Sequence, residues 1–259
     1  MASTINKLFP QDAMAVTTLA DSKIRFRVRS NLRLRKSRLV VSPEEGLVVE
    51  MPKTPSIRRA KKLVNLRKTW VLNALESVDE KLAMARGIKR HTDSVLVMGK
   101  EKRIIIRRGQ SRAFTLETAT RIHLGFEEKS VAKEKIYARL TLWLRAKAEA
   151  YLPLRVRQLN RSRFTYDSVV VKNQKTLWGS CSAEGIINLN WRIIMAPKAQ
   201  IDYIILHELC HTKHLNHSNA YWNVVASVCP DFKTCEAWFC DLGFLLDLRQ
   251  AFLPNGWQF

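Results

Sequence analysis

Two histidines four residues apart end a strongly apolar segment of this chain, and they constrain its fold more than any other feature. They lie in the run His207-Glu208-Leu209-Cys210-His211. In an α-helix, residues four apart lie on one face, one turn apart, so both imidazoles can reach a single metal ion. Glu208, one residue after the first histidine, would contact water beside the ion rather than the ion itself. The run therefore predicts a metal-binding helix with Glu208 as the general base.

A catalytic zinc ion usually has three protein ligands and one open position, so a third ligand must come from elsewhere in the chain. We favour His217, because a turn at residues 215–216 would direct its side chain back toward the helix. His214 is one alternative, but a ligand on the same helix at that position would be nearly collinear with the first two. Glu236, on a later predicted helix, is the other. The predicted ligands of one zinc ion are thus His207, His211 and His217.

The positive charge of the chain is large and unevenly distributed. The net charge is +21 over 259 residues, but 46% of the residues are hydrophobic and only 26% are charged, which excludes a disordered polycation. Residues 1–172 carry a net charge of +22 and residues 173–259 a net charge of −1. A basic region of this kind predicts a polyanionic partner, nucleic acid first and an anionic membrane surface second.

The cysteines and the apolar runs indicate a cytoplasmic protein. The chain has five cysteines, all in its last third, and an odd number without regular spacing argues against a secreted disulfide framework. No apolar run approaches the length of about 18–20 residues that spans a bilayer. The N-terminal segment is a poor signal peptide. Nothing in the sequence predicts the oligomeric state.

The spacing of apolar residues predicts three parts. Residues 1–22 are expected to be a loose leader. Residues 23–125 are expected to form a basic strand–helix–strand region, because period-two alternation over 24–51 predicts antiparallel strands and 53–87 has helical spacing. Residues 126–259 would hold the metal site, with a long helix that begins at Ser130 and stops at Pro153 and another from Pro197 to about His214.

Four segments around the histidines resemble the YgjP-like metallopeptidase family, a zincin family related to the SprT-like proteases. They are residues 173–182 with the run Trp178-Gly179-Ser180-Cys181, residues 187–191, residues 201–211, and residues 216–222. The resemblance is tight over about residues 165–245 and looser in the N-terminal half. It implies an α+β fold with a zincin-like catalytic domain, a sheet plus an active-site helix. It also implies zinc ligands His207, His211 and His217, with Glu208 catalytic.

One position departs from the family pattern. Leu177 stands where the family usually has arginine, so any role of that arginine in holding a substrate is in doubt for this chain. Gly179 in the neighbouring run would allow a close approach of the backbone to another element.

The predicted function is zinc-dependent hydrolysis of peptide bonds in a peptide or protein substrate, through a metal-bound water with Glu208 as general base. The oxyanion would be stabilised by Tyr203, Lys213 or Tyr221, among which the sequence does not choose. A metal-dependent phosphohydrolase acting on nucleotides is the alternative, since metal ions also polarise phosphoryl oxygens. A nucleic-acid-associated protein, whose basic N-terminal half recruits the protease, is a third possibility.

Overall fold

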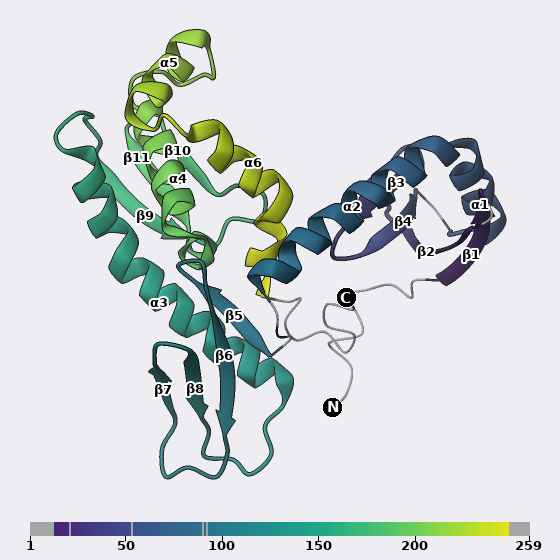
Figure 1. Cartoon of the computed structure of the whole chain (residues 1–259), viewed down its shortest axis with the longest axis horizontal. Helices are drawn as coiled ribbons and strands as arrows, with labels where there is room; N and C mark the ends of the chain where they lie inside the picture. The colour runs from purple at the N-terminus through teal and green to yellow at the C-terminus, as the bar shows by residue number, and fades with distance from the viewer. Residues whose placement is uncertain (1–12, 21, 53, 90, 92, 249–259) are drawn as a thin grey trace. The chain divides into compact units, whose positions relative to one another are not determined.

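The computed structural model describes residues 13–248, apart from residues 21, 53, 90 and 92. These residues form six α-helices and three small sheets (Figure 1), so the predicted α+β class is confirmed. The chain divides into two compact units, Met1–Met84 and Ala85–Phe259. Each unit has its own cluster of buried apolar side chains.

This division differs from the expected boundaries at residues 22 and 125. Residues 1–12 of the expected leader lie outside the described residues, and Ala13–Leu19 form a strand, β1, which pairs with the next strand along the chain. The sheet formed by residues 94–125 contributes to the same buried cluster as the long helix that follows it. Shared burial therefore places this sheet in the unit of the histidines rather than in the basic N-terminal region.

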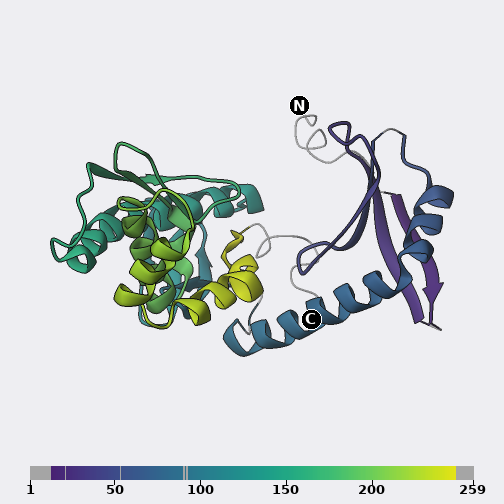
Figure 2. The ribbon, with the colours of Figure 1, turned by 90° about the horizontal axis from the view of Figure 1, so that it is seen from above.

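Unit 1 is a four-stranded sheet with a helix packed against it. The strand order is β1–β2–β4–β3, with β2 at Ser22–Ser30, β3 at Arg38–Ser42 and β4 at Gly46–Met51. The pair β3–β4 is antiparallel as expected, the unexpected strand β1 pairs antiparallel with β2, and β2 and β4 pair in parallel. Helix α1 (Ile57–Leu66) lies beside β1 (Figure 2), and α2 (Lys68–Ile88) follows after a break at Arg67 and crosses the division into unit 2.

The sheet of unit 1 alternates apolar and charged side chains. Phe26 and Val28 of β2 are buried in the cluster that includes α1, while Arg27 and Arg29 alternate with them. Glu50 on β4, only 3% exposed, accepts hydrogen bonds from Arg29 Nη2 at 2.6 Å and from Arg38 Nε at 2.6 Å. The basic strands are thus held together by carboxylates of their own sheet.

Unit 2 begins with a second four-stranded sheet and the longest helix. The strand order is β5–β6–β8–β7, with β5 at Ser94–Val97, β6 at Lys100–Arg107, β7 at Phe114–Glu117 and β8 at Arg121–Gly125. Helix α3 runs from Lys133 to Asn160, so the expected stop at Pro153 is wrong. Buried Leu152 and Val156 continue its apolar stripe through the proline. The carbonyl that Pro153 leaves without a helical donor belongs to the exposed Glu149, where water can replace the lost hydrogen bond.

The remaining elements surround a third sheet. Its order is β10–β11–β9, with β9 at Ser168–Lys172, β10 at Gly179–Cys181 and β11 at Ile186–Asn190. A short 3-10 helix (Trp191–Met195) leads into α4 (Lys198–His211), and α5 (Asn219–Val228) and α6 (Phe232–Leu242) follow. Both α3 and α4 contact this sheet and each other. Across the described part of the chain, every helix is too short or too polar to cross a membrane.

Candidate metal centre

Helix α4 carries the first two histidines on a buried scaffold. Its side chains Ile201, Ile205 and Leu209 are completely buried, as the helical spacing predicts. The helix ends at His211, where we had expected about His214. Beyond it the chain turns, with the amide of His214 donating to the carbonyl of Cys210. The turn brings the next residues back toward the helix.

Three imidazole nitrogens meet at the end of α4. The Nε2 atoms of His207 and His211 are 3.3 Å apart, and the Nε2 atom of His217 lies 3.2 Å from each of them. Tetrahedral ligands at zinc–nitrogen distances of about 2.0–2.1 Å are separated by about 3.3–3.4 Å. The three nitrogens therefore have the spacing of three ligands on one tetrahedral ion. They form the one group of possible metal ligands found among the described residues, and it includes neither His214 nor Glu236.

Hydrogen bonds and ring contacts orient these imidazoles. His211 Nδ1 lies 2.9 Å from the carbonyl oxygen of His214, an arrangement that places the ring proton on Nδ1 and leaves the Nε2 lone pair toward the other histidines. The buried ring of Tyr221 stacks on His211 with centroids 4.4 Å apart, and its hydroxyl donates to the carbonyl of His207. His214 thus contributes to the centre through its backbone.

Burial keeps the histidines of α4 in the form that binds metals. Burial, and then the proximity of His211 and His217, lowers the pKa of His207 to about 3. Burial also lowers the pKa of His211. Neutral imidazole is the form that ligates a metal ion, so these residues do not need to lose a proton at neutral pH before binding one.

Glu208 lies against a glycine of the edge strand β10. Its side chain is only 4% exposed, and burial raises the pKa of its carboxyl group to about 8. A Cβ atom at Gly179 would lie 2.5 Å from Glu208 Oε1, so only glycine leaves room for the carboxylate. The predicted close approach of the backbone at Gly179 to another element is therefore confirmed, and the group that it meets is the Glu208 side chain of α4. Glu208 Oε2 is buried and has no hydrogen-bond partner among the described residues.

Asn190 is a supporting residue that the sequence analysis missed. It is 3% exposed at the end of β11, and its Nδ2 donates to the carbonyls of Gln174 and Leu177, at 3.0 and 2.9 Å. These bonds hold the loop that precedes β10 and therefore Gly179. The side chain of Leu177 is 53% exposed, so the position where the family usually has arginine projects into solvent. The family resemblance includes Asn190 in residues 187–191, but its role could not be predicted, because its partners are backbone atoms 13 and 16 residues away.

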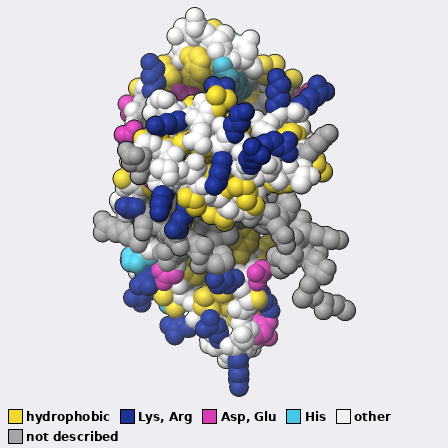
Figure 3. Space-filling view, turned by 90° about the vertical axis from the view of Figure 1, so that its right-hand side faces the viewer, with side chains coloured by type: hydrophobic (Ala, Val, Ile, Leu, Met, Phe, Trp, Pro, Cys, Tyr) yellow, Lys and Arg dark blue, Asp and Glu magenta, His cyan; other side chains and the backbone are white. Residues whose placement is uncertain are grey.

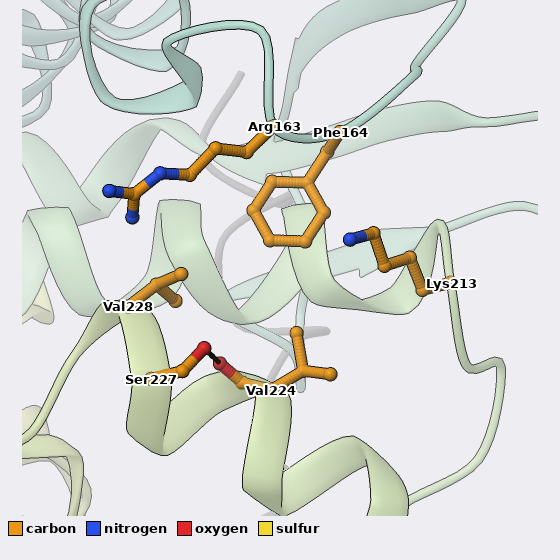
Figure 4. Close-up of a pocket in the computed structure, with 6 residues that line it drawn as sticks. All are labelled: Arg163, Phe164, Lys213, Val224, Ser227 and Val228. Carbon is orange, nitrogen blue, oxygen red and sulfur yellow. Dashed lines mark hydrogen bonds between the residues drawn. The ribbon is translucent and has the colours of Figure 1, made fainter.

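The candidates for oxyanion stabilisation have other contacts. The Tyr221 hydroxyl is bonded to the carbonyl of His207, as described above. Lys213 points to the ring of Phe164, with Nζ 4.9 Å from the centroid (Figure 4). Tyr203 packs edge-on against His207 at 5.7 Å between centroids, and burial raises the pKa of its phenol.

The pocket that Figure 4 shows is separate from the three histidines. It lies between the segment after α3 and helix α5, and its lining comprises Arg163, Phe164, Lys213, Val224, Ser227 and Val228. Ser227 donates its hydroxyl to the carbonyl of Val224 at 2.7 Å. Lys213 therefore belongs to this pocket and not to the candidate metal centre.

The cysteines do not form a second site. All five are free thiols, and Cys210 is completely buried on α4 with a pKa that burial raises to about 12. Burial, and then the charge of Glu208, raises the pKa of Cys181. A raised thiol pKa disfavours the thiolate that nucleophilic catalysis requires.

A comparison with protein families identifies a match to this chain. The family model of the YgjP-like metallopeptidase domain matches residues 35–241, which include every element from β3 to α5 and most of α6. Comparisons with curated proteins and with solved structures gave no significant match.

Proposed function

The chain belongs to the YgjP-like metallopeptidase family, and we propose that it hydrolyses peptide bonds at one zinc ion held by His207, His211 and His217. The observation that carries this proposal is the triangle of Nε2 atoms, with sides of 3.2–3.3 Å. Three neutral nitrogen ligands with a carboxylate beside them are the donor set of a catalytic zinc site. Carboxylate-rich sites, which suit magnesium and phosphoryl transfer, have a different composition. The donor set thus favours a peptidase over a nucleotide phosphohydrolase.

A bound zinc ion supplies a Lewis acid that polarises a carbonyl group and acidifies water. Glu208 then moves the protons. Burial favours the neutral carboxyl group, but the positive charge of a bound zinc ion would favour the carboxylate that a general base requires. Glu208 Oε2 has no hydrogen-bond partner among the described residues, so this carboxylate can accept a proton from the attacking water and pass it to the nitrogen of the leaving amine. Gly179 fixes the position of the carboxylate during both transfers, because the group rests against β10.

Strand β10 provides a place for the substrate backbone. Within the described residues β10 pairs only with β11, so its other edge is free. An extended peptide can add to such an edge through backbone hydrogen bonds. Gly179 would bring the peptide next to Glu208. We propose a zincin-like architecture for this unit because a free sheet edge lies next to the helix that carries His207 and His211.

The experiment compares Glu208→Gln with Glu236→Gln, a matched change at an exposed glutamate. We expect Glu208→Gln to bind zinc as the unmodified protein does but to lose casein hydrolysis by a factor of about 10²–10⁴. Glu236→Gln should retain both properties. Hydrolysis by Glu208→Gln at the unmodified rate would refute the mechanism. Zinc-dependent release of phosphate from nucleoside triphosphates, without hydrolysis of casein, would favour the phosphohydrolase instead.

A further inference from the structure

Helix α1 and its junction with α2 carry an unusual concentration of positive charge. No Asp or Glu occurs between Glu50 and Glu76, whereas six exposed cations lie in α1 and at the α1–α2 junction. This set, the α1 basic surface, comprises Arg58, Arg59, Lys61, Lys62, Arg67 and Lys68. Lys and Arg side chains also outnumber acidic ones on the face that Figure 3 shows.

The cations of the α1 basic surface differ from those of the neighbouring strands. Arg27, Arg29 and Arg38 on the sheet form ion pairs with Glu45 or Glu50, with nitrogen–oxygen distances of 2.6–3.6 Å. None of the six cations of the α1 basic surface pairs with a described carboxylate. The ion pairs of Arg27, Arg29 and Arg38 therefore offset part of the positive charge of the sheet. The six cations of the α1 basic surface have no such compensation among the described carboxylates.

The charge arrangement on α1 opposes helix stability. Arg58 and Lys62 are four residues apart, and Arg59 and Lys62 are three apart, so like charges face each other on the helix surface. Its first turn contains no acidic residue to offset the positive end of the helix dipole. A polyanion bound to this surface would weaken the repulsion between these cations and place negative charge near the N-terminus of the helix.

Two features favour nucleic acid over a membrane as the polyanion. The apolar side of α1, with Ala60 and Val64 completely buried, already packs on the sheet and cannot insert between lipids. The exposed apolar residues Ile57 and Leu66 are nine residues apart, half a turn out of phase, so they form no stripe. Arg58–Lys62 spans about 6 Å of helix axis, and duplex DNA offers one phosphate charge per about 1.7 Å.

We propose that the α1 basic surface binds the phosphate backbone of nucleic acid without reading its sequence. Cations that contact phosphates release condensed counterions, so binding of this type depends steeply on salt. The proposal does not depend on the metallopeptidase activity, because no residue of the metal centre takes part in it.

The test measures binding of the full-length protein to a labelled duplex of random sequence by fluorescence anisotropy. One variant replaces Arg58, Arg59, Lys61 and Lys62 by glutamine. A control variant replaces four other exposed cations that have no ion pair, Arg107, Arg108, Arg112 and Lys129, and so has the same net charge. Glutamine preserves helix propensity, and circular dichroism checks the fold of both variants.

We expect salt-dependent binding by the unmodified protein, with the α1 variant at least about tenfold weaker and its salt slope smaller by up to about 3.6. The control variant should bind within about twofold of the unmodified protein. Equal losses of affinity for the duplex in both variants would show that binding depends only on the total charge, and this would overturn the proposal. A lack of binding by the unmodified protein at about 50 mM salt, where electrostatic affinity is high, would also overturn the proposal. Binding to phosphatidylserine vesicles but not to DNA, lost in the α1 variant, would assign the surface to membranes instead.

Discussion

At the scale of single residues, the centre depends on the absence of one side chain. Gly179 on β10 leaves a gap that the carboxylate of Glu208 fills, 29 positions further along the chain. Asn190 holds the loop before Gly179 through two backbone carbonyls. The position of the proposed general base is therefore fixed by two residues outside the group of three histidines.

We predict that Gly179→Ala reduces peptide hydrolysis by about 100-fold while zinc binding is retained. The new Cβ would lie 2.5 Å from Glu208 Oε1, so the carboxylate must move, and displacement of a reacting group by about 1 Å costs about that factor. Hydrolysis and zinc content of the purified variant are the measurements. Gly87→Ala, where no atom lies within 4 Å of the new Cβ, is the control and should leave activity unchanged. A fully active Gly179→Ala enzyme would show that the contact has no catalytic importance.

At the scale of elements, a tight turn holds the beginning of α4, the helix that carries His207 and His211. The amides of Met98 and Gly99, between β5 and β6, donate to the carbonyls of Ile194 and Met195. Gly99 has a φ of +74°, and a Cβ atom there would lie 2.7 Å from the Cα of Pro197, just before α4. The second sheet therefore supports α4 from its N-terminal end, opposite the end that carries the histidines.

Gly99→Ala should destabilise unit 2 by about 3 kcal/mol, because it adds backbone strain to a steric clash. Gly109→Ala separates the two effects. Gly109 has a similar φ of +65°, but the nearest atom lies 3.9 Å from its new Cβ. We expect this control to cost only about 1 kcal/mol. Urea unfolding measures the stability of both variants. Equal unfolding midpoints would show that the contact of Gly99 with Pro197 does not contribute to the loss of stability.

The sequence predicted individual helices and strands better than the way in which they pair and pack. Period-two alternation over 24–51 is confirmed by three strands there, and the apolar spacing before His207 is confirmed by α4. The predicted helix over 53–87 is in fact two helices, and Pro153 does not end α3. Parallel pairing of β2 with β4 and the contact of Gly179 with Glu208 depend on tertiary packing, which no local pattern encodes. Spacing did predict that His217 would return to His207 and His211.

At the scale of the whole molecule, the chain has two buried clusters rather than one core. One cluster lies within β1–β4, α1 and the start of α2, and the other within the unit that holds the histidines. The basic surface and the candidate metal centre belong to different units. The division lies at residue 84 rather than 125, and the positive charge does not follow it, because Met1–Met84 carries a net charge of +9 and Ala85–Phe259 a net charge of +12.

Acid should destabilise unit 1 through Glu50. Burial raises the pKa of this carboxyl group, but hydrogen bonds from Arg29, Arg38 and Asn31 outweigh burial and hold the pKa below its usual value of 4.5. Ionised Glu50 therefore stabilises the folded state above about pH 4.5, and this contribution is lost as the pH falls through the lowered folded-state pKa. Urea unfolding of unit 1 should accordingly show stability that declines below about pH 4.5.

Glu50→Gln is the control for this pH dependence. The variant should be less stable by about 2 kcal/mol at neutral pH, because Arg38 loses the charge of Glu50 and Arg29 loses one of its two charged partners. Its stability should vary less with pH over the same range. An identical acid dependence in the variant would show that other carboxylates cause the loss.

The central claim is that His217, and not His214, completes a three-histidine zinc site, and zinc titration of two alanine variants tests it most directly. We expect His214→Ala to bind one zinc ion with nearly the affinity of the unmodified protein, because only the backbone carbonyl of His214 contacts His211. Removal of a group that only supports a metal ligand costs about 10–100-fold in metal affinity. His217→Ala removes a proposed ligand, so we expect it to lower the affinity for zinc by more than this factor. Tight zinc binding by His217→Ala, or loss of zinc only in His214→Ala, would contradict the account.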